Sequence, residues 1–314
     1  MAKRIRLALD WTPNTIHTGF YVAAAKGWYE DAGITVTFLS PEEDGYETSP
    51  AQKVAEGTAD LAIAPSESII SFQTKLNPVP LMAIAAVLAK DASAIVTLQQ
   101  SGIERPAQLD EKIYASYQAR FEDAIVRQLI INDGGVGDFN IIYPERLGIW
   151  NTLLSGAADA TWIFLPWEGL EARLRDVELN AFQLSDYGIP YGYSPVLLAH
   201  ADYIQSDSKT LKAFLQATAR GYQFAKNDPF EAARILLETA PQLASTDPNF
   251  VEQSQVYISQ YYLDDNGHWG VMQIKIWEDF VNWLLKKNIL QENSDLPVDT
   301  LDIYQLFTNE FFES

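Results

Sequence analysis

Short apolar runs alternate with segments of helical periodicity along the first ninety residues. Apolar runs bounded by Gly, Pro and Asp predict strands, and apolar positions three or four apart predict helices. The predicted strands are 5–9, 34–39, 60–64 and 78–89, and the predicted helices are 20–31, 51–57 and 66–74. Ser66 is a candidate N-cap of the last helix. This alternation predicts right-handed βαβ units and a mainly parallel sheet.

A second alternating series follows the first. The predicted strands are 112–114, 140–143 and 160–163, and the predicted helices are 121–133 and 147–155. The two series share a short repeat, Gly57-Thr58-Ala59-Asp60 in the first and Gly156-Ala157-Ala158-Asp159 in the second. Each copy closes a helix and opens a buried strand, and each strand then runs into a polar or aromatic loop. Two similarly wound halves are the simplest explanation.

The last third of the chain is predicted to be helical. A short apolar strand, 196–199, precedes it. Apolar residues at helical spacing predict helices over 211–227, 229–239, 249–262 and 271–287. We expect these helices to form a cap on one lobe, with Trp269, Trp277 and Trp283 as core residues.

The charge balance narrows the range of partners. The 314 residues include 42 acidic and 22 basic side chains, a formal net charge of −20. Such a chain is repelled by a phosphate backbone or an anionic lipid surface, so we expect neither nucleic acid nor membrane as a partner. The alternative is that the charge only keeps the surface soluble. No run of about 18 apolar residues is present, which predicts no membrane-spanning helix.

The sequence leaves the compartment open. Met1 leads directly into the first strand with no hydrophobic leader segment. We expect an extracytoplasmic location if a leader was removed, and a cytoplasmic one if Met1 is the native start.

Signals for catalysis and metal binding are weak. The chain has no cysteine, which excludes disulfides, thiolate nucleophiles and zinc–thiolate sites. It contains no G-x-S-x-G, H-E-x-x-H, P-loop or G-x-G-x-x-G motif. The three histidines, His17, His200 and His268, lie far apart in the sequence. We therefore predict no catalytic residue, no metal site and no cofactor.

Polar and aromatic side chains gather on the loops that follow predicted strands. In open α/β sheets ligands bind beyond the carboxyl ends of strands, so these loops are the expected recognition sites. After the first strand come Trp11, Asn14 and His17, an indole, an amide and an imidazole suited to a flat polar ligand. The alternative is a self-satisfied loop in which Asn14 caps the following helix. The loop after 60–64 adds Pro65, Ser66 and Glu67.

Similar loops in the second half complete the candidate ligand-binding set. They contribute Tyr114, Tyr117, Trp162, Trp167, Glu168, Tyr191 and Tyr193. The alternatives are turn chemistry around Tyr117 and a glutamate at position 168 that serves a helix dipole. Turn chemistry explains Gly188, Pro190 and Gly192 but not the three tyrosines, Tyr187, Tyr191 and Tyr193, in the same seven positions.

Several segments resemble a known family. The motif Leu9-Asp10-Trp11-Thr12-Pro13-Asn14-Thr15-Ile16-His17-Thr18-Gly19, with Ala24-Ala25-Lys26-Gly27-Trp28-Tyr29 and Gly33-Ile34-Thr35-Val36, resembles solute-binding proteins that carry thiamine pyrimidine precursors for ABC transporters. The same superfamily contains the fungal pyrimidine synthase of thiamine biosynthesis. The resemblance implies an α/β, type II periplasmic-binding-protein fold with C-terminal helices. Two lobes would be joined by a two-segment hinge and would trap a small aminopyrimidine between them.

The resemblance also implies where the two lobes begin and end, and some positions of this chain differ from the family pattern. The crossovers are expected near 88–92 and 195–199, so that residues 1–90 and 197–314 form one lobe and 91–196 the other. Ile16 stands where the family often has asparagine, and Ser194 where transport relatives have glutamate. The fungal enzyme's cysteine-rich run corresponds to 191–195, and its pyridoxal-phosphate lysine and histidine to 64–68. Neither set is present in this chain.

The preferred hypothesis is a monomeric, non-enzymatic binding protein. It would bind a planar nitrogen heterocycle resembling a thiamine pyrimidine precursor, in an interlobe cleft, and would deliver it to an ABC permease. The rival is an enzyme on the same fold in thiamine-pyrimidine or related cofactor biosynthesis, with His17, Glu67 or Glu168 as acid–base groups. A third possibility is a sensor or orphan receptor that kept the fold and lost transport.

Overall fold

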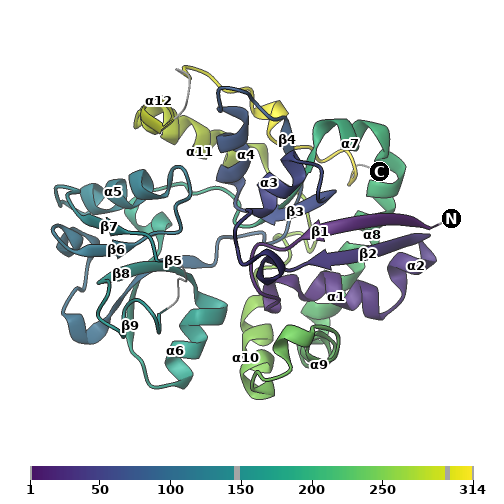
Figure 1. Ribbon diagram of the computed structural model, residues 1–314, viewed down its shortest axis with the longest axis horizontal. Helices are drawn as coiled ribbons and strands as arrows, with labels where there is room; N and C mark the ends of the chain where they lie inside the picture. Colours follow the sequence, from purple (N-terminus) through teal and green to yellow (C-terminus); the bar gives the residue numbers. More distant parts are fainter. Residues whose placement is uncertain (1, 145–148, 294–297, 313–314) are drawn as a thin grey trace. The chain divides into compact units, whose positions relative to one another are not determined.

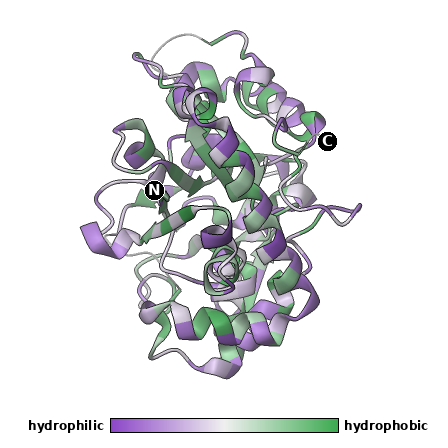
Figure 2. Ribbon diagram, turned by 90° about the vertical axis from the view of Figure 1, so that its right-hand side faces the viewer, coloured by the Kyte–Doolittle hydropathy of each residue, from purple (hydrophilic) through white to green (hydrophobic). Residues whose placement is uncertain are grey.

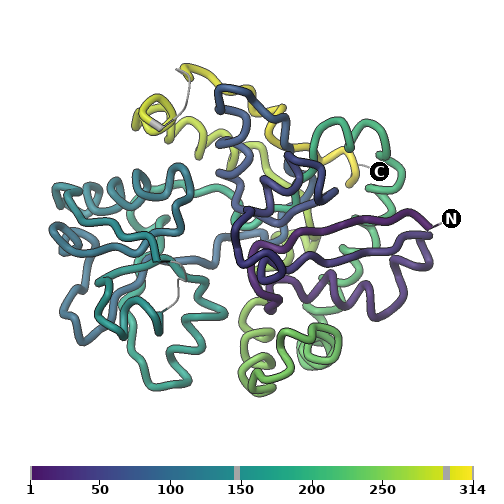
Figure 3. Tube along the Cα trace, in the orientation of Figure 1, coloured from purple at the N-terminus to yellow at the C-terminus, as the bar shows by residue number. Residues whose placement is uncertain are grey.

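The computed structural model describes residues 2–144, 149–293 and 298–312. The chain divides into two compact units (Figure 1). Unit 1 contains Met1–Asp91, Gly192–Trp277 and Leu301–Ser314, and unit 2 contains Ala92–Tyr191 and Glu278–Thr300. The chain therefore passes from unit 1 into unit 2 and back twice (Figure 3). The region 278–300 groups with unit 2, although the sequence placed it in the first lobe. The limits of the functional lobes stay a prediction.

Unit 1 is built on a five-stranded sheet in the order β2-β1-β3-β10-β4. Its strands are β1 (Lys3–Ala8), β2 (Ile34–Leu39), β3 (Leu61–Ala64), β4 (Leu81–Ala86) and β10 (Val196–His200). β1 pairs in parallel with β2 and β3, whereas β10 runs antiparallel to both of its neighbours, β3 and β4. Four strands thus share one direction, as the predicted mainly parallel sheet requires. β3 is buried along its whole length, which explains its uninterrupted apolar sequence.

Unit 2 repeats this arrangement with a sheet in the order β7-β6-β8-β5-β9. Its strands are β5 (Ser93–Leu98), β6 (Ile113–Ala115), β7 (Asn140–Ile142), β8 (Ala160–Phe164) and β9 (Leu179–Phe182). β6 is parallel to β7 and β8, and β5 is antiparallel to β8 and β9. The strands β5 and β9 were not predicted from the sequence. β5 directly follows the segment assigned to a crossover, and β9 has only four residues.

The short repeat has the same structure in both units. Gly57 and Gly156 end their turns with φ of +72° and +75°, a conformation that favours glycine. The Asp60 carboxylate accepts the backbone N–H of Arg6 in β1, at 2.7 Å, and the Asp159 carboxylate accepts the backbone N–H of Ile113 in β6, at 2.8 Å. Each aspartate thereby ties its incoming strand to the neighbouring parallel strand. The predicted repeat of this turn and strand entry is confirmed, whereas turns over 149–155 replace the helix expected before its second copy.

Helices surround both sheets and carry apolar and polar residues along their length (Figure 2). In unit 1 they are α1 (Thr18–Ala25), α2 (Trp28–Asp31), α3 (Pro50–Ala55), α4 (Ser66–Gln73), α7 (Ala201–Ser206), α8 (Ser208–Asn227), α9 (Pro229–Thr239) and α10 (Pro248–Ile258). Unit 2 contains α5 (Glu122–Asn132), α6 (Leu170–Leu174) and α12 (Ile289–Asn293), and α11 (Ile274–Lys286) begins in unit 1 and continues into unit 2. None of the described helices has the length and apolar character needed to cross a membrane.

Three local predictions are wrong. The helix expected over 20–31 is broken into α1 and α2 at Gly27, whose φ is +71°. In the segment 147–155, residues 147 and 148 lie outside the described residues, and 149–155 form turns instead of a helix. Ser66 is the first residue of α4, and the N-cap is Pro65. The three tryptophans predicted to be core residues, Trp269, Trp277 and Trp283, are confirmed, since none is more than 8% exposed.

Candidate functional site

The loop after β1 is closed by the side chain of Asn14. Its Oδ1 accepts the backbone N–H of Ile16 at 2.8 Å, and its Nδ2 donates to the carbonyl of Thr12 at 3.1 Å. The residue is only 3% exposed and caps the short helix Thr15–His17. Asn14 therefore caps a helix, as the alternative interpretation of the sequence predicts. A direct contact between Asn14 and a ligand stays a prediction.

His17 is held inside the same loop. Its Nδ1 accepts the backbone N–H of Asn14 at 3.1 Å, and its Nε2 lies 2.7 Å from Oδ1 of Asp10. Because a backbone amide only donates, Nε2 must carry the ring proton and donate to the carboxylate. The side chain is fully buried. Both ring nitrogens of His17 are thus hydrogen-bonded to other residues of the loop.

Trp11 is the candidate in this loop whose ring is only partly buried. Its ring packs against that of Tyr46 with centroids 5.2 Å apart and a tilt of 55°. The hydroxyl of Thr12 donates to Glu42 at 3.0 Å and therefore accepts from Tyr46, at 2.8 Å. The acidic loop after β2 thus forms one cluster with Trp11.

Buried polar side chains of α10, together with Tyr262, form hydrogen bonds to the loop after β1. The hydroxyls of Thr15 and Ser254 lie 2.6 Å apart, and Thr18 donates to Oε1 of Gln255 at 2.6 Å. Nε2 of Gln255 donates at 3.0 Å to the hydroxyl of Tyr262, which in turn donates to the carbonyl of Thr15. All five residues are completely buried. A buried network in which each member has a partner fixes one conformation of the loop.

A second support comes from α8. The hydroxyl of Tyr222 donates to the carbonyl of Ile16 at 2.8 Å, and its ring stacks on Trp269 with centroids 4.8 Å apart. The backbones of α1 and α8 come very close here, since a Cβ on Gly221 would lie 1.9 Å from the carbonyl oxygen of Gly19. The side chain of Ile16, one of the departures from the family pattern, is 3% exposed.

The loop after β3 brings together two other candidates, Ser66 and Tyr193. The backbone N–H of Ser66 donates to the carbonyl of Tyr193 at 2.9 Å. The hydroxyl of Ser66 is buried and has no hydrogen-bond partner among the described residues. Tyr193 is 4% exposed, and its hydroxyl accepts the backbone N–H of Gln273 at 2.8 Å. Glu67 follows in the first turn of α4 and is 4% exposed.

The loop after β6 in unit 2 presents Tyr117. This residue is 40% exposed, whereas Tyr114 at the strand end is only 2% exposed. Desolvation, and then the carboxylates of Glu168 and Glu122, hold the pKa of Tyr117 well above its usual range. Glu168, predicted separately from the sequence, thus acts electrostatically on Tyr117.

Aromatic rings gather where β8 ends. The rings of Trp162 and Tyr191 lie 5.2 Å apart at a tilt of 53°, and Tyr191 also meets Phe280 edge-on at 5.2 Å. Oε2 of Glu168 accepts the backbone N–H of Phe164 at 3.1 Å, in a turn that also carries the partly buried Trp167. Within unit 2 the structure thus pairs Trp162 with Tyr191, and the carboxylate of Glu168 contributes to the raised pKa of Tyr117.

Comparison with known proteins agrees with this architecture. The family described as NMT1/THI5 like matches residues 14–232. The chain belongs to the NMT1/THI5-like family. It is 25% identical over 311 residues to the formylaminopyrimidine-binding protein of Halalkalibacterium halodurans, covering 97% of this chain and 90% of that one.

Two further similarities support the family and the fold. The chain is 25% identical over 248 residues to the 4-amino-5-hydroxymethyl-2-methylpyrimidine phosphate synthase of Legionella pneumophila, covering 77% of this chain and 76% of that one. The solved alkanesulfonate-binding protein SsuA of Xanthomonas axonopodis pv. citri superposes with a TM-score of 0.71 at 13% identity, covering 98% of this chain and all of that one. The predicted periplasmic-binding-protein fold is confirmed.

The structure of this NMT1/THI5-like protein adds residues that the sequence analysis missed. Tyr46 and Glu42 join the Trp11 cluster, and Glu122 binds the Tyr117 loop. The sequence offered only one hint of Tyr46 and Glu42, which is that Tyr46 is a single aromatic residue in an acidic, turn-rich segment. Glu122 is not distinguishable by sequence from the neighbouring Asp123.

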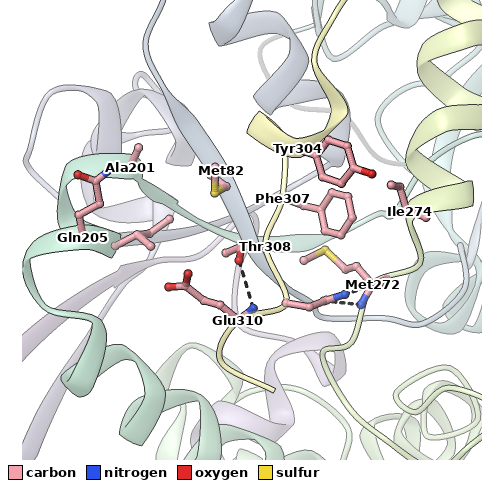
Figure 4. Close-up of a pocket in the computed structure, with 11 residues that line it drawn as sticks. Met82, Ala201, Gln205, Met272, Ile274, Tyr304, Phe307, Thr308 and Glu310 are labelled. Carbon is pink, nitrogen blue, oxygen red and sulfur yellow. Dashed lines mark hydrogen bonds between the residues drawn. The ribbon is translucent and has the colours of Figure 1, made fainter. Parts of the chain in front are cut away.

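One pocket of this NMT1/THI5-like protein contains none of the predicted site residues (Figure 4). It has a volume of about 600 Å³ and lies in unit 1, where Leu306 and Thr308 hydrogen-bond to Ala83 of β4. Met82, Met272 and Phe307 form part of its wall. Among the described residues no group of three His, Asp or Glu side chains has the arrangement of a metal site.

Proposed function

We propose that this protein binds a small planar nitrogen heterocycle resembling a thiamine pyrimidine precursor, without performing chemistry on it. The similarity to a formylaminopyrimidine-binding protein over nearly the whole length of both chains carries this proposal. The Trp11 loop of unit 1 and the Tyr117, Trp162 and Glu168 loops of unit 2 would supply the contacts.

The side chains on these loops suit an aminopyrimidine. Flat rings stack on partly exposed aromatic side chains, and Trp11, Tyr117 and Trp162 each retain exposed surface. An exocyclic amino group donates hydrogen bonds, and the carboxylates of Glu42 and Glu168 are acceptors next to these rings. The same pattern supports a neutral or cationic ligand better than an anionic one.

Calorimetry with a panel of thiamine precursors tests the ligand class. We expect formylaminopyrimidine or 4-amino-5-hydroxymethyl-2-methylpyrimidine to bind with a Kd below 1 mM, roughly 4 kcal/mol of binding free energy. Trp11→Ala should weaken binding at least about tenfold, or ~1.4 kcal/mol. Failure of every panel member to bind would reject the ligand class, and an unchanged affinity of the variant would remove Trp11 from the site.

The alternative is an enzyme on the same fold, and the similarity to pyrimidine phosphate synthases motivates it. An acid–base group must reach the proton that it transfers. His17 is fully buried and both of its nitrogens are hydrogen-bonded within its loop, which disfavours that role. We expect the ligand to be recovered unchanged after prolonged incubation, as measured by mass spectrometry. A protein-dependent product would favour the enzyme.

We further propose an ABC permease as partner and an extracytoplasmic location for the native protein. The proposal rests on the similarity to a formylaminopyrimidine-binding protein and on the fold shared with a solved alkanesulfonate-binding protein. Fractionation of native cells should place the protein outside the cytoplasmic membrane, and deletion of its gene should slow precursor uptake. Recovery only with the cytoplasm would favour the enzyme or a sensor.

A further inference from the structure

A buried carboxylate organises the loop that carries Tyr117. Glu122 is the first residue of α5 and is 2% exposed. One oxygen accepts the hydroxyl proton of Tyr114 at 2.6 Å, and both oxygens lie 3.0 Å from the backbone nitrogen of Tyr117. The backbone N–H of Ala119 donates to the second oxygen at 3.2 Å. A single side chain therefore accepts hydrogen bonds from a phenol and from two backbone amides of one loop.

The loop has a backbone conformation that needs such support. Gln118 has φ of +62°, in the left-handed region that costs a non-glycine residue about 1 kcal/mol or more. Its backbone N–H donates to the hydroxyl of Ser116 at 3.1 Å, and the N–H of Ser116 donates to the carbonyl of Ile142 in β7 at 3.0 Å. The amides of Tyr117 and Ala119, on either side of Gln118, both bind Glu122. The unusual turn is thus fastened on both sides by one carboxylate.

The environment of Glu122 shows that this arrangement has a cost. Desolvation is the main cause that raises the pKa of Glu122, and the neighbouring Asp123 raises it further. The hydrogen bonds from Tyr114, Tyr117 and Ala119 act in the opposite direction. Asp123 itself accepts from the hydroxyl of Tyr143 at 3.0 Å and makes none of the loop contacts described for Glu122. Ionising the buried carboxylate of Glu122 therefore costs more free energy than ionising an exposed carboxylate would.

We propose that Glu122 is a positioning residue for ligand binding: it fixes the backbone of Tyr117 so that the partly exposed ring is held in one place for the ligand. Glu122 itself does not touch the ligand. This proposal rests on the proposed function, in which Tyr117 is a ligand contact. Affinity would depend on Glu122 only through Tyr117.

The first experiment needs no ligand. Hydrogen exchange of the Tyr117 and Ala119 amides is measured by NMR in the wild type, in Glu122→Gln and in the matched control Asp123→Asn. We expect at least about tenfold faster exchange in Glu122→Gln, because the amide group of glutamine retains only one acceptor oxygen. The control should exchange like the wild type. Equal protection in all three proteins would overturn the proposal.

A second variant covers the case in which Glu122→Gln does not fold. Glu122→Asp keeps the charge but withdraws the carboxylate by one methylene group. It should also expose the two loop amides to faster exchange, whereas Tyr114→Phe, which leaves both amide hydrogen bonds in place, should not. Fast exchange in Tyr114→Phe alone would assign the support of the loop to the phenol instead of the carboxylate.

The second experiment separates positioning from mere structural support. Affinity for formylaminopyrimidine is measured by calorimetry in the wild type, Glu122→Gln, Tyr117→Ala and the double variant. We expect Glu122→Gln to weaken binding about tenfold in the wild type and less than twofold in the Tyr117→Ala background. Independent, multiplicative effects would overturn the proposal. If the wild type binds no panel member, the proposed function fails, and the exchange experiment still decides whether Glu122 holds the loop.

Discussion

The loops after β1 and after β6 leave equivalent strands of two similarly wound sheets, yet different chemistry holds them. The β1 loop rests on neutral hydroxyl and amide groups of α8, α10 and Tyr262, more than 200 positions away in the sequence. The β6 loop rests on the carboxylate of Glu122, five residues from Tyr117. The first loop depends on correct packing of the C-terminal helices, and the second depends on a local side chain and its charge.

The largest expected effect comes from separating α1 and α8. In Gly221→Ala the new Cβ would collide with the carbonyl oxygen of Gly19, and backbone cannot move aside as a flexible side chain can. We expect the free energy of unfolding to fall by about 3 kcal/mol, measured by urea denaturation. Gln216→Ala, on the exposed side of α8, is the control and should change stability by less than about 0.5 kcal/mol. A tolerated Gly221→Ala would show that the β1 loop does not need this close approach.

A smaller loss is expected from breaking the neutral network. Gln255→Leu removes the acceptor of Thr18 and the donor to Tyr262, leaving buried polar groups with fewer partners. Such a change costs about 2 kcal/mol of unfolding free energy. Gln260→Leu, an exposed neighbour, should be nearly neutral. If the two variants unfold at the same urea concentration, the network does not support the loop.

The repeated aspartates allow a direct comparison between the units. Asp60 accepts from the backbone and also from Nε and Nη2 of Arg6, at 3.1 and 2.7 Å, whereas Asp159 in unit 2 accepts the backbone N–H of Ile113. We expect Asp60→Asn to cost about 1.5 kcal/mol and Asp159→Asn about half as much. Thermal unfolding of the two variants measures the difference, and a larger loss from Asp159→Asn would contradict this ranking.

The smallest expected effect is a pH dependence of stability, which distinguishes the support of the β6 loop by Glu122 from the support of the β1 loop by neutral groups. The pKa of Glu122 is raised above its ordinary value of 4.5 in the folded state, mainly by desolvation. Between pH 4.5 and the folded pKa, the folded protein therefore holds a proton that the unfolded chain has lost. This stabilisation is fully present below pH 4.5 and disappears as the pH rises through the folded pKa.

Measuring the free energy of unfolding as a function of pH tests the direction of this dependence. As the pH falls from 7 toward 4.5, the wild type should gain stability relative to Glu122→Gln, by at most about 1.4 kcal/mol per pH unit. The difference between the wild type and Gln255→Leu should not change with pH, because Gln255 and its partners Thr18 and Tyr262 are uncharged over this pH range. The opposite slope for Glu122→Gln would mean that hydrogen bonds outweigh desolvation at this carboxylate.

Local periodicity predicted most of the regular elements. The strands β1, β2, β3, β6, β7, β8 and β10 and the helices α4, α5, α8, α9, α10 and α11 lie within a few residues of the predicted ranges. The short strand β9 and the break at Gly27 were missed, because the first depends on pairing with β5 and the second on one residue's positive φ.

The candidate sites were predictable in part. The sequence pointed to the loops of Trp11, Tyr117 and Glu168, since polar and aromatic residues at strand ends are a local signal. It did not reveal Tyr46 or Glu122, because their contacts depend on how separate segments fold against each other. For Asn14 and His17 the structure shows hydrogen bonds within the loop, and their contact with a ligand stays a prediction.

The sequence by itself determined the alternation of strands and helices, the internal repeat and the family, because all three are encoded in short-range patterns of residue type. The tertiary structure decided what holds each loop. A buried polar group must find its partners wherever the fold brings them, and for Thr18 the partner is Gln255 in α10, while for Tyr117 it is Glu122 in the next helix. Two loops equivalent in topology consequently differ in the distance and in the charge of the groups that support them.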